Sequence, residues 1–400
     1  MNGGLSKLWQ KDGTKSVLAS LISILIGMAV GGVIILVVGL GNKNLGATGA
    51  WEGIRLVFGG LFSTGRNAAG QLTFGFNSTS VGNMLFRATP LILTGLSVAV
   101  AFKTGLFNIG AAGQYTLGAF GGLYCALVLH LPWFVCLLVS ALLGAVWGAI
   151  PGIFKAYLNI NEVITSIMFN WIGLYLVCEV IYGRGAGPMY DANNTRTWKV
   201  QDVSPGSLIP SMGLSEYFHT TSNTIAIFLA IAVAILIWVV LEKTTFGYEL
   251  KAVGLNKNAA RYAGINEKKN IILSMTIAGA LAGFGAGLLY LSGGAEWNPL
   301  NTTTLPAMGF NGIATALLAS SHPIGTIFSS LFVSHITVGG SFLPTRYFPT
   351  EIADLISGII IYLCAFAMLF RSLISHVMER KRKNTQAAAA APDKTGKEGK

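Results

Sequence analysis

The chain contains a series of apolar runs that are each about as long as a bilayer is thick. A transmembrane helix needs about 20 consecutive, mostly apolar residues. Hydrophobic residues make up 52% of the 400 residues and charged residues only 11%, a balance that excludes an ordinary soluble domain. We predict an all-α polytopic protein, multi-pass in the cell membrane, with about ten transmembrane helices at residues 17–40, 81–102, 109–131, 133–158, 163–182, 223–241, 271–292, 306–320, 324–340 and 352–370.

The first of these runs, at residues 17–40, has a second interpretation as a cleaved signal peptide. The apolar region of a signal peptide is shorter than this run, so the sequence favours a membrane span. The runs that begin at residues 109, 306 and 324 are interrupted by Gly, Pro and polar residues. Broken helices are tolerated in a membrane only where they are buried in protein or line a cavity. We therefore expect the transport pathway beside these three segments.

The basic residues predict the orientation of the spans. An N-terminus on the cytoplasmic side places Lys103, Lys155, the 243–270 segment and the C-terminal tail on that same side, which then holds most of the 27 Lys and Arg. We predict that both termini are cytoplasmic. The domain division that follows is a cytoplasmic N-terminus (1–16), a transmembrane domain (17–372) with an external cap (183–222), and a basic disordered tail (373–400).

A polar insert, at residues 243–270, separates two strongly apolar runs and holds a dense cluster of Lys and Arg. Its central part, residues 255–262, is predicted to be a short helix that ends near Gly254 and Gly264. A small helix between two membrane spans suits a surface that another protein grips. We interpret the insert as a cytoplasmic docking loop.

Polar residues within or beside the spans are the candidate pathway groups, because a charged group at the bilayer centre costs about 3 kcal/mol unless it is paired or wet. For each of them a structural role is the alternative: capping a helix, complementing its dipole, joining helices through amides, or packing. The segments 107–114 and 308–315 also resemble each other and predict an inverted repeat. The candidates are Phe107, Asn108, Gln114, Asn161, Glu162, Asn170, Trp171 and Asn311.

Several other classes of function find little support in the sequence. It contains no phosphate-binding loop, nucleophile elbow or carboxylate cluster, so we expect no enzymatic activity and no cofactor. The four Cys fall inside apolar runs without metal-ligand spacing, and we expect no metal. The formal charge of +11 is explained by orientation in the bilayer, so nucleic acid is not an expected partner. An uphill transporter without a phosphate-binding loop needs a separate motor subunit.

Five stretches of the chain resemble one transporter family. They are ATPLILTGLSVAVAFK (88–103), GLFNIGAAGQ (105–114), NEVITSIMFNW (161–171), TFGYELKAVGLN (245–256) and AARYAGI (259–265). The sequence is similar to the permease subunits of bacterial ABC importers of the branched-chain amino acid, ribose and nucleoside type, closest to the nucleoside branch. The likeness runs from about residue 88 to 370. Members of this family usually carry an acidic residue where Ala112 stands, which weighs against a charge-based role there.

The resemblance implies the partners and the coupling residues. It implies an ABC ATPase subunit, a second permease that completes a heterodimer, and a lipid-anchored extracytoplasmic solute-binding protein. It also implies that residues 249–265 form the loop that contacts the ATPase. The expected coupling residues are Glu249, Lys251, Gly254, Asn256, Ala259, Ala260, Arg261 and Gly264.

The expected function is uptake of a small uncharged polar solute, most simply a nucleoside. Simple sugars and branched-chain amino acids are the alternative solutes, although a zwitterion needs charged or helix-terminal groups in the pathway, and the spans offer few. An ion-coupled secondary transporter that works alone is the alternative of a different class. The scarcity of acidic residues inside the spans argues against it.

Overall fold

The computed structural model describes residues 12–41, 46–67, 69, 71–183, 187–344, 347 and 348, and then residues 352, 355, 356, 358, 359, 362 and 372. Most of this chain is helical. Six helices are long and apolar enough to cross a membrane among the described residues: α4 (Ser78–Lys103), α6 (Trp133–Leu158), α7 (Glu162–Tyr182), α10 (Ala226–Lys243), α13 (Glu267–Tyr290) and α15 (Pro323–Ser341). The all-α polytopic class is confirmed at this level.

The remaining predicted spans differ in extent from the helices that form. The predicted span 109–131 contains α5 (Ala111–Leu127), and 306–320 contains α14 (Ala307–Leu318), so both of these interrupted segments give shorter helices. The N-terminal run lies in α2 (Asp12–Gly41), which is followed by α3 (Gly46–Gly59). The tail 373–400 lies outside the described residues, as do residues 1–11 and most of the predicted span 352–370.

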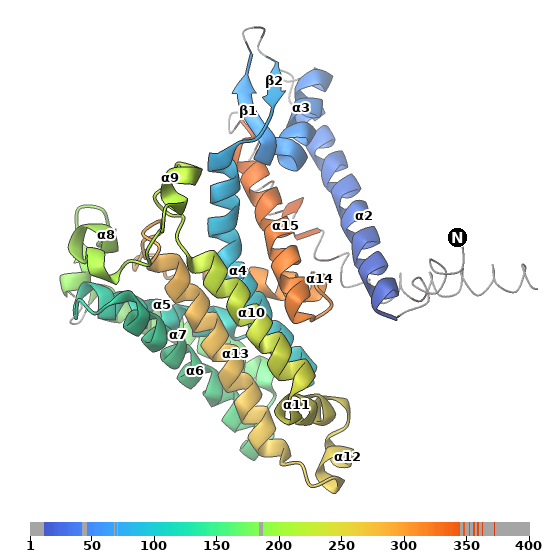
Figure 1. Cartoon of the computed structure of the whole chain (residues 1–400), viewed down its shortest axis with the longest axis vertical. Helices are drawn as coiled ribbons and strands as arrows, with labels where there is room; N and C mark the ends of the chain where they lie inside the picture. The colour runs from blue at the N-terminus through green and yellow to red at the C-terminus, as the bar shows by residue number, and fades with distance from the viewer. Residues whose placement is uncertain are drawn as a thin grey trace, which may run out of the picture.

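Helix α13 is the centre of the bundle and packs against α4, α5 and α6 (Figure 1). Its closest approach is to α6, where glycines of both helices meet. A Cβ added at Gly283 would lie 3.0 Å from the Cα of Gly144, and one added at Gly148 would lie 2.9 Å from the Cα of Gly279. The small residues therefore let the two backbones touch, as they do in tightly packed membrane helices.

A second group of helices covers the other side of α4. Helices α14 and α15 pack on α4, and α3 packs on α15. His335 on α15 lies 2.9 Å from the carbonyl oxygen of Phe58 on α3. This second group, coloured orange and blue, stands beside the α5–α6–α7–α13 group in Figure 1.

The fold also contains a small amount of β structure, which the sequence did not predict. Strands β1 (Ser63–Arg66) and β2 (Leu72–Phe74) form one antiparallel hairpin, and β3 (Tyr190–Asp191) and β4 (Arg196–Thr197) form another. The second hairpin belongs to the segment that was predicted to be an irregular cap. Among the described residues, that segment also contains four short helices: η2 (Gly187–Met189), α8 (Val200–Val203), η3 (Pro205–Ser207) and α9 (Leu214–Phe218).

Candidate functional site

The polar insert between α10 and α13 folds into two helices, α11 (Thr245–Leu255) and α12 (Lys257–Tyr262). The short helix predicted over residues 255–262 forms as α12, which begins two residues later than predicted. The predicted break at Gly254 is wrong, because Gly254 lies inside α11. The break falls at Asn256, whose side chain accepts a hydrogen bond from the Ala259 N–H at 3.1 Å. An Asn at this position satisfies an otherwise unpaired amide and begins a new helix.

Polar contacts hold α11 against its neighbours. The Glu249 carboxylate accepts a hydrogen bond at 3.2 Å from the amide nitrogen of Asn270, near the start of α13. The Lys251 ammonium lies 3.0 Å from the carboxylate of Glu242, near the end of α10. Two of the predicted coupling residues thus fasten the insert to the membrane helices on either side of it.

Small residues bring the insert into contact with the end of α4. A Cβ added at Gly254 would lie 2.6 Å from the carbonyl oxygen of Lys103, so the two backbones touch there. Gly105, with φ of +68°, faces Gly254 from the other side of this contact. Ala260 on α12 is buried in a small core that includes Val253, Ile271 and Met275. Gly254 and Ala260 therefore lie at internal packing positions.

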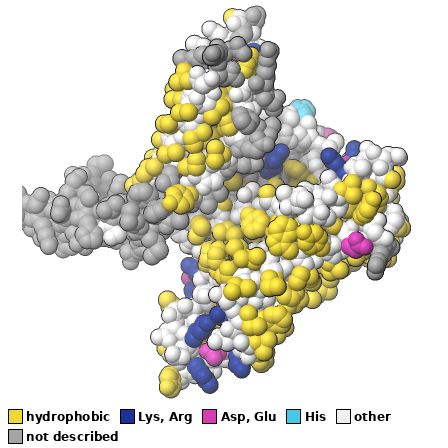
Figure 2. All heavy atoms as spheres, turned by 180° about the vertical axis from the view of Figure 1, so that it is seen from behind, with side chains coloured by type: hydrophobic (Ala, Val, Ile, Leu, Met, Phe, Trp, Pro, Cys, Tyr) yellow, Lys and Arg dark blue, Asp and Glu magenta, His cyan; other side chains and the backbone are white. Residues whose placement is uncertain are grey.

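The exposed side of the insert consists of other residues. Leu255 is 88% exposed and Tyr262 is 94% exposed, and Tyr248 is also exposed. Asn256, Ala259, Arg261 and Gly264 lie on the same exposed stretch. Lys and Arg side chains gather at this end of the molecule (Figure 2). The sequence did not single out Leu255 and Tyr262; the signal available was two large apolar side chains within a polar insert.

The amides of the predicted pathway bind one another inside the protein. Asn108 and Gln114 exchange two hydrogen bonds, of 2.8 and 3.0 Å, and Asn108 also donates to Ser97 Oγ at 3.0 Å. Both amides are almost fully buried. The pair closes the break before α5, which is the structural role considered for these residues.

Asn170 joins α7 to the same break. Its amide nitrogen donates to the carbonyl oxygen of Ile109 at 3.0 Å, and its amide oxygen accepts from the Gly113 N–H at 2.7 Å. Asn170, Asn108 and Gln114, distant in sequence, therefore form one buried polar cluster around the start of α5. Buried amides with satisfied partners specify helix positions in this way.

Two candidates at the start of α7 have a structural explanation. Asn161 accepts a hydrogen bond from the Val163 N–H at 2.8 Å and caps the helix. The Glu162 carboxylate lies 2.9 Å from the Lys155 ammonium at the end of α6. A carboxylate in the first turn also complements the helix dipole.

The remaining candidates lie apart from the amide cluster. Phe107 stacks on Phe102 with ring centres 5.2 Å apart, and Trp171 stacks on Tyr175 at 6.1 Å. Trp171 is exposed, whereas the preceding residue, Asn170, is buried. Asn311 on α14 is half-buried.

The two segments of the predicted repeat meet in space. Gly309, at the start of α14, packs against the backbone of Ala112, at the start of α5, where an added Cβ would lie 2.8 Å from the Ala112 Cβ. Ala112 is fully buried. The contact gives a steric reason for a small residue at Ala112 in this chain.

Comparison with known proteins shows which family this sequence belongs to. Residues 80–365 match the family described as "Branched-chain amino acid transport system / permease component". The chain is 31% identical to the guanosine ABC transporter permease protein NupP of Bacillus subtilis, over 91% of this chain and 97% of NupP. It is 34% identical to the nucleoside ABC transporter permease protein NupB of Lactococcus lactis subsp. cremoris, over 95% and 98%.

A third relative carries a different solute in its name. The glucose ABC transporter permease protein TsgB13 of Haloferax volcanii is 30% identical, over 80% of this chain and 85% of TsgB13. No solved structure matches the chain. The family match covers the bundle from α4 through α15 together with the α11–α12 insert, and the chain therefore belongs to the permease component family of branched-chain amino acid transport systems.

Proposed function

We propose that this protein is a permease subunit of an ABC importer and forms half of the pathway by which nucleosides enter the cell. The observation that carries this proposal is the similarity, over nearly the whole chain, to two permeases named for guanosine and nucleosides. ATP hydrolysis belongs to a separate subunit, since the sequence has no phosphate-binding loop.

The ATPase docks on the exposed surface of the α11–α12 insert. Leu255 and Tyr262 supply the large side chains that anchor a protein interface, and Asn256, Ala259, Arg261 and Gly264 surround them. Glu249, Lys251, Gly254 and Ala260 hold this surface in place. The exposed residues contact the ATPase and the packed residues fix the shape of the insert, so both groups are needed for docking.

The insert passes motion of the ATPase to the bundle through its internal contacts. The Glu249–Asn270 hydrogen bond links α11 to α13, and the Gly254 contact links it to the end of α4. Helices α4 and α13 pack on each other along the bundle. A displacement of α11 therefore moves the pair α4–α13 and exposes the pathway alternately to each side.

A second permease completes the pathway, and it is a relative of this chain. Bacillus subtilis NupP and NupQ are both similar to this chain, as are NupB and NupC of Lactococcus lactis subsp. cremoris. Two related permeases in one organism favour a heterodimer. A lipid-anchored solute-binding protein delivers the solute to the external side, where the cap at residues 183–222 contacts it.

The topology that fits this arrangement has ten spans, with both termini in the cytoplasm and the α11–α12 insert on the cytoplasmic side. The Ala112–Gly309 contact supports an inverted repeat, because it brings the starts of α5 and α14 together. Phe107, Trp171 and Asn311 contact the solute or lie beside its path. Asn108, Gln114, Asn161, Glu162 and Asn170 fix the helices around that path.

The experiment that tests the solute is competition for uptake in proteoliposomes that hold the complete importer. Labelled guanosine is supplied with its binding protein outside and ATP inside. Unlabelled nucleosides should compete, and glucose and leucine should not. Competition by glucose alone would transfer the assignment to the second candidate solute, a simple sugar, which the similarity to TsgB13 favours.

A further inference from the structure

The outward faces of the membrane helices differ in chemistry. On α6 the exposed large side chains in the first half of the helix are Phe134, Leu138, Leu142 and Val146. On α10 they are Phe228, Ile235, Leu236 and Val239. Such purely apolar faces are suited to lipid chains, because they bring no polar group into the hydrocarbon.

The outward face of α7 has a polar component. Trp171, Tyr175, Glu179 and Tyr182 are all exposed and follow one another at helical spacing, on a face that also exposes the apolar side chains of Met168, Ile172 and Leu176. Trp171 is at the middle of Glu162–Tyr182, whereas Trp and Tyr that face lipid gather at the membrane surfaces. A carboxylate in a membrane helix usually faces the protein interior or water. This stripe therefore belongs to a wet or protein-lined passage.

A cavity of about 790 Å³ lies along the stripe, between α7 and the segment that follows α13. Its wall is largely apolar, with Glu179 as the one charged side chain among the residues that line it. From α7 it is lined by Ile172, Tyr175, Leu176, Cys178, Glu179 and Tyr182, and from the opposite side by Pro299, Leu300 and Thr302. Its volume is within the range of about 300–1,000 Å³ that small-molecule sites occupy. The rings of Trp171 and Tyr175 are 28° from parallel and extend the aromatic wall towards the middle of the helix.

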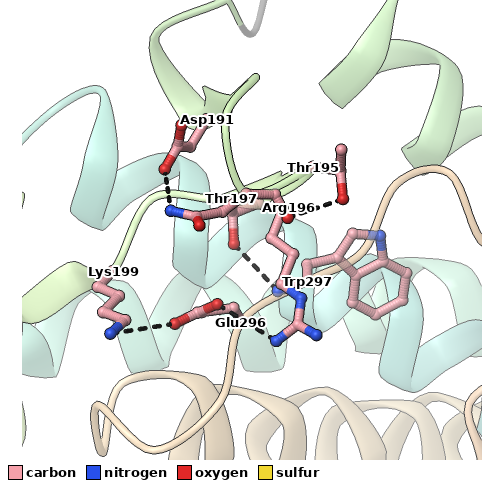
Figure 3. Close-up of polar contacts among 8 residues, drawn as sticks. Asp191, Thr195, Arg196, Thr197, Lys199, Glu296 and Trp297 are labelled. Carbon is pink, nitrogen blue, oxygen red and sulfur yellow. Dashed lines mark hydrogen bonds and ion pairs between the residues drawn. The ribbon is translucent and has the colours of Figure 1, made fainter.

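Polar contacts join the cap to the segment that follows α13 (Figure 3). Thr197 and Trp297 are joined twice: the Thr197 N–H donates to the Trp297 carbonyl oxygen at 2.9 Å, and the Trp297 N–H donates to Thr197 Oγ1 at 3.0 Å. The Glu296 carboxylate lies 3.6 Å from Arg196 and 3.9 Å from Lys199. These contacts fix the chain just before Leu300 and Thr302, so the cavity has two positioned walls.

We propose that the cavity on α7, lined by Tyr175, Glu179, Tyr182 and Thr302, is the outer solute site of the pathway and binds a nucleoside. The flat base stacks on Tyr175, and the sugar hydroxyls donate hydrogen bonds to the Glu179 carboxylate. The choice of a nucleoside as the ligand rests on the proposed function. The new inference is the location of the site on α7. It is open on one side in a single subunit, and the second permease closes that side.

The first test asks whether the cavity is wet. The Tyr175→Cys and Leu142→Cys variants are made in a chain whose four native cysteines are replaced by Ala, and each assembled importer is treated with a charged, water-soluble thiol reagent. A thiol in water reacts as its thiolate, so we expect the Tyr175→Cys variant to react at least about tenfold faster than the Leu142→Cys variant. Guanosine with its binding protein should slow the reaction. Equal, slow labelling of the two variants would overturn the proposal.

The second test asks whether the aromatic ring contacts the solute. Tyr175→Leu removes the ring, Tyr175→Phe keeps it, and Phe228→Leu makes a comparable change on the apolar face of α10. We expect Tyr175→Leu to lower kcat/KM for guanosine uptake about tenfold, because stacking on a base is lost. Tyr175→Phe keeps the ring and should therefore retain more activity than Tyr175→Leu. Phe228→Leu should stay within about twofold of the unchanged protein, because Phe228 lies outside the proposed site.

The outcomes separate this proposal from the proposed function. Wild-type uptake of guanosine with equal uptake by the Tyr175→Leu variant would overturn the solute site and leave the function intact. Failure of the unchanged protein and the Phe228→Leu variant to take up any nucleoside would contradict the proposed function and, with it, the nucleoside as ligand. The thiol-labelling result needs no transport, so it tests the wet cavity in either case.

Discussion

Neighbouring residues of the α11–α12 insert have opposite environments. Gly254 touches the backbone at the end of α4, while the next residue, Leu255, is almost wholly exposed. Such a change over one peptide bond follows from the helical geometry of α11, which turns consecutive side chains to different sides. The residues that hold the insert and the residues that present its surface can therefore be tested separately.

The packing role of Gly254 predicts a loss of stability when a side chain is added. Gly254→Val forces the insert away from Lys103 and should lower the free energy of unfolding by about 1–3 kcal/mol, the usual effect of overpacking. Ala259→Val is the matched control, because Ala259 is exposed on α12. Thermal unfolding in detergent measures both. Equal melting temperatures for the two variants would contradict the close contact at Gly254.

His322 predicts a pH dependence of the turn before α15. Its Nδ1 accepts a hydrogen bond from the Gly325 N–H at 3.4 Å. Partial burial and the positive charge of Lys103 lower the pKa of His322 below its usual range, and the Glu242 carboxylate opposes the shift. The fold therefore prefers the neutral ring, and stability is lost as the pH falls below about 6.5 towards the lowered value.

The measurement for His322 compares melting temperatures between about pH 8 and pH 5, a range that spans the usual pKa of His. The unchanged protein should lose more stability on acidification than the His322→Asn variant, whose neutral side chain also caps a helix. Other titrating groups change the melting temperatures of both proteins alike, so the difference between the two pH curves reports on His322. Parallel pH curves for the two proteins would refute the assignment.

The two helices of the α11–α12 insert together form the proposed docking surface for the ATPase. The double change Leu255→Ala and Tyr262→Ala removes its two largest exposed side chains and should reduce ATPase co-purification at least about tenfold, because such anchors often carry about 2 kcal/mol of binding free energy. Folding should be unaffected, since neither side chain is buried.

The matched control for this double variant is Met212→Ala. Met212 is a large, exposed apolar residue just before α9, at the other end of the molecule. The Met212→Ala protein should retain the ATPase in full. Retention of the ATPase by the Leu255→Ala, Tyr262→Ala protein would show that the insert is not the docking surface.

Apolar length and breaking residues were enough to predict most of the membrane helices. Helix α6 covers the predicted residues 133–158, and α15 differs from 324–340 by one residue at each end. The division of the insert into two helices was not predicted, because it depends on Asn256 acting as a cap rather than on a Gly or Pro. The two short hairpins were missed because each strand is only two to four residues long.

The candidate site residues could be chosen from the sequence, but their contacts could not be predicted from it. Asn108, Gln114 and Asn170 are conspicuous polar residues in apolar runs, yet only the tertiary structure shows that they bind one another. Ala260 and Leu255 are both apolar residues of the insert. Only the tertiary structure shows that Ala260 on α12 is buried while Leu255, at the end of α11, is exposed. The alignment of Trp171, Tyr175, Glu179 and Tyr182 could be predicted from helical spacing, but their exposure could be known only from the structure.

The proposed function makes the whole bundle one half of an assembly. The α11–α12 insert joins it to α4 and α13, and the cap positions the wall of the α7 cavity at the opposite end of the bundle (Figure 1). Helix α13 extends from Glu267 near the insert to Tyr290 near the cap. It therefore connects the proposed motor contact with the proposed solute entrance through a single close-packed element.

The proposed function makes transport depend on a separate motor subunit, and uptake by proteoliposomes with and without the ATPase tests this dependence. Both samples contain the two permeases, enclosed ATP and the external binding protein with labelled guanosine. A proton or sodium gradient is then imposed on each. We predict accumulation only where the ATPase is present, and no effect of the gradients. Accumulation driven by an ion gradient in the sample without the ATPase would contradict the account and identify a secondary transporter.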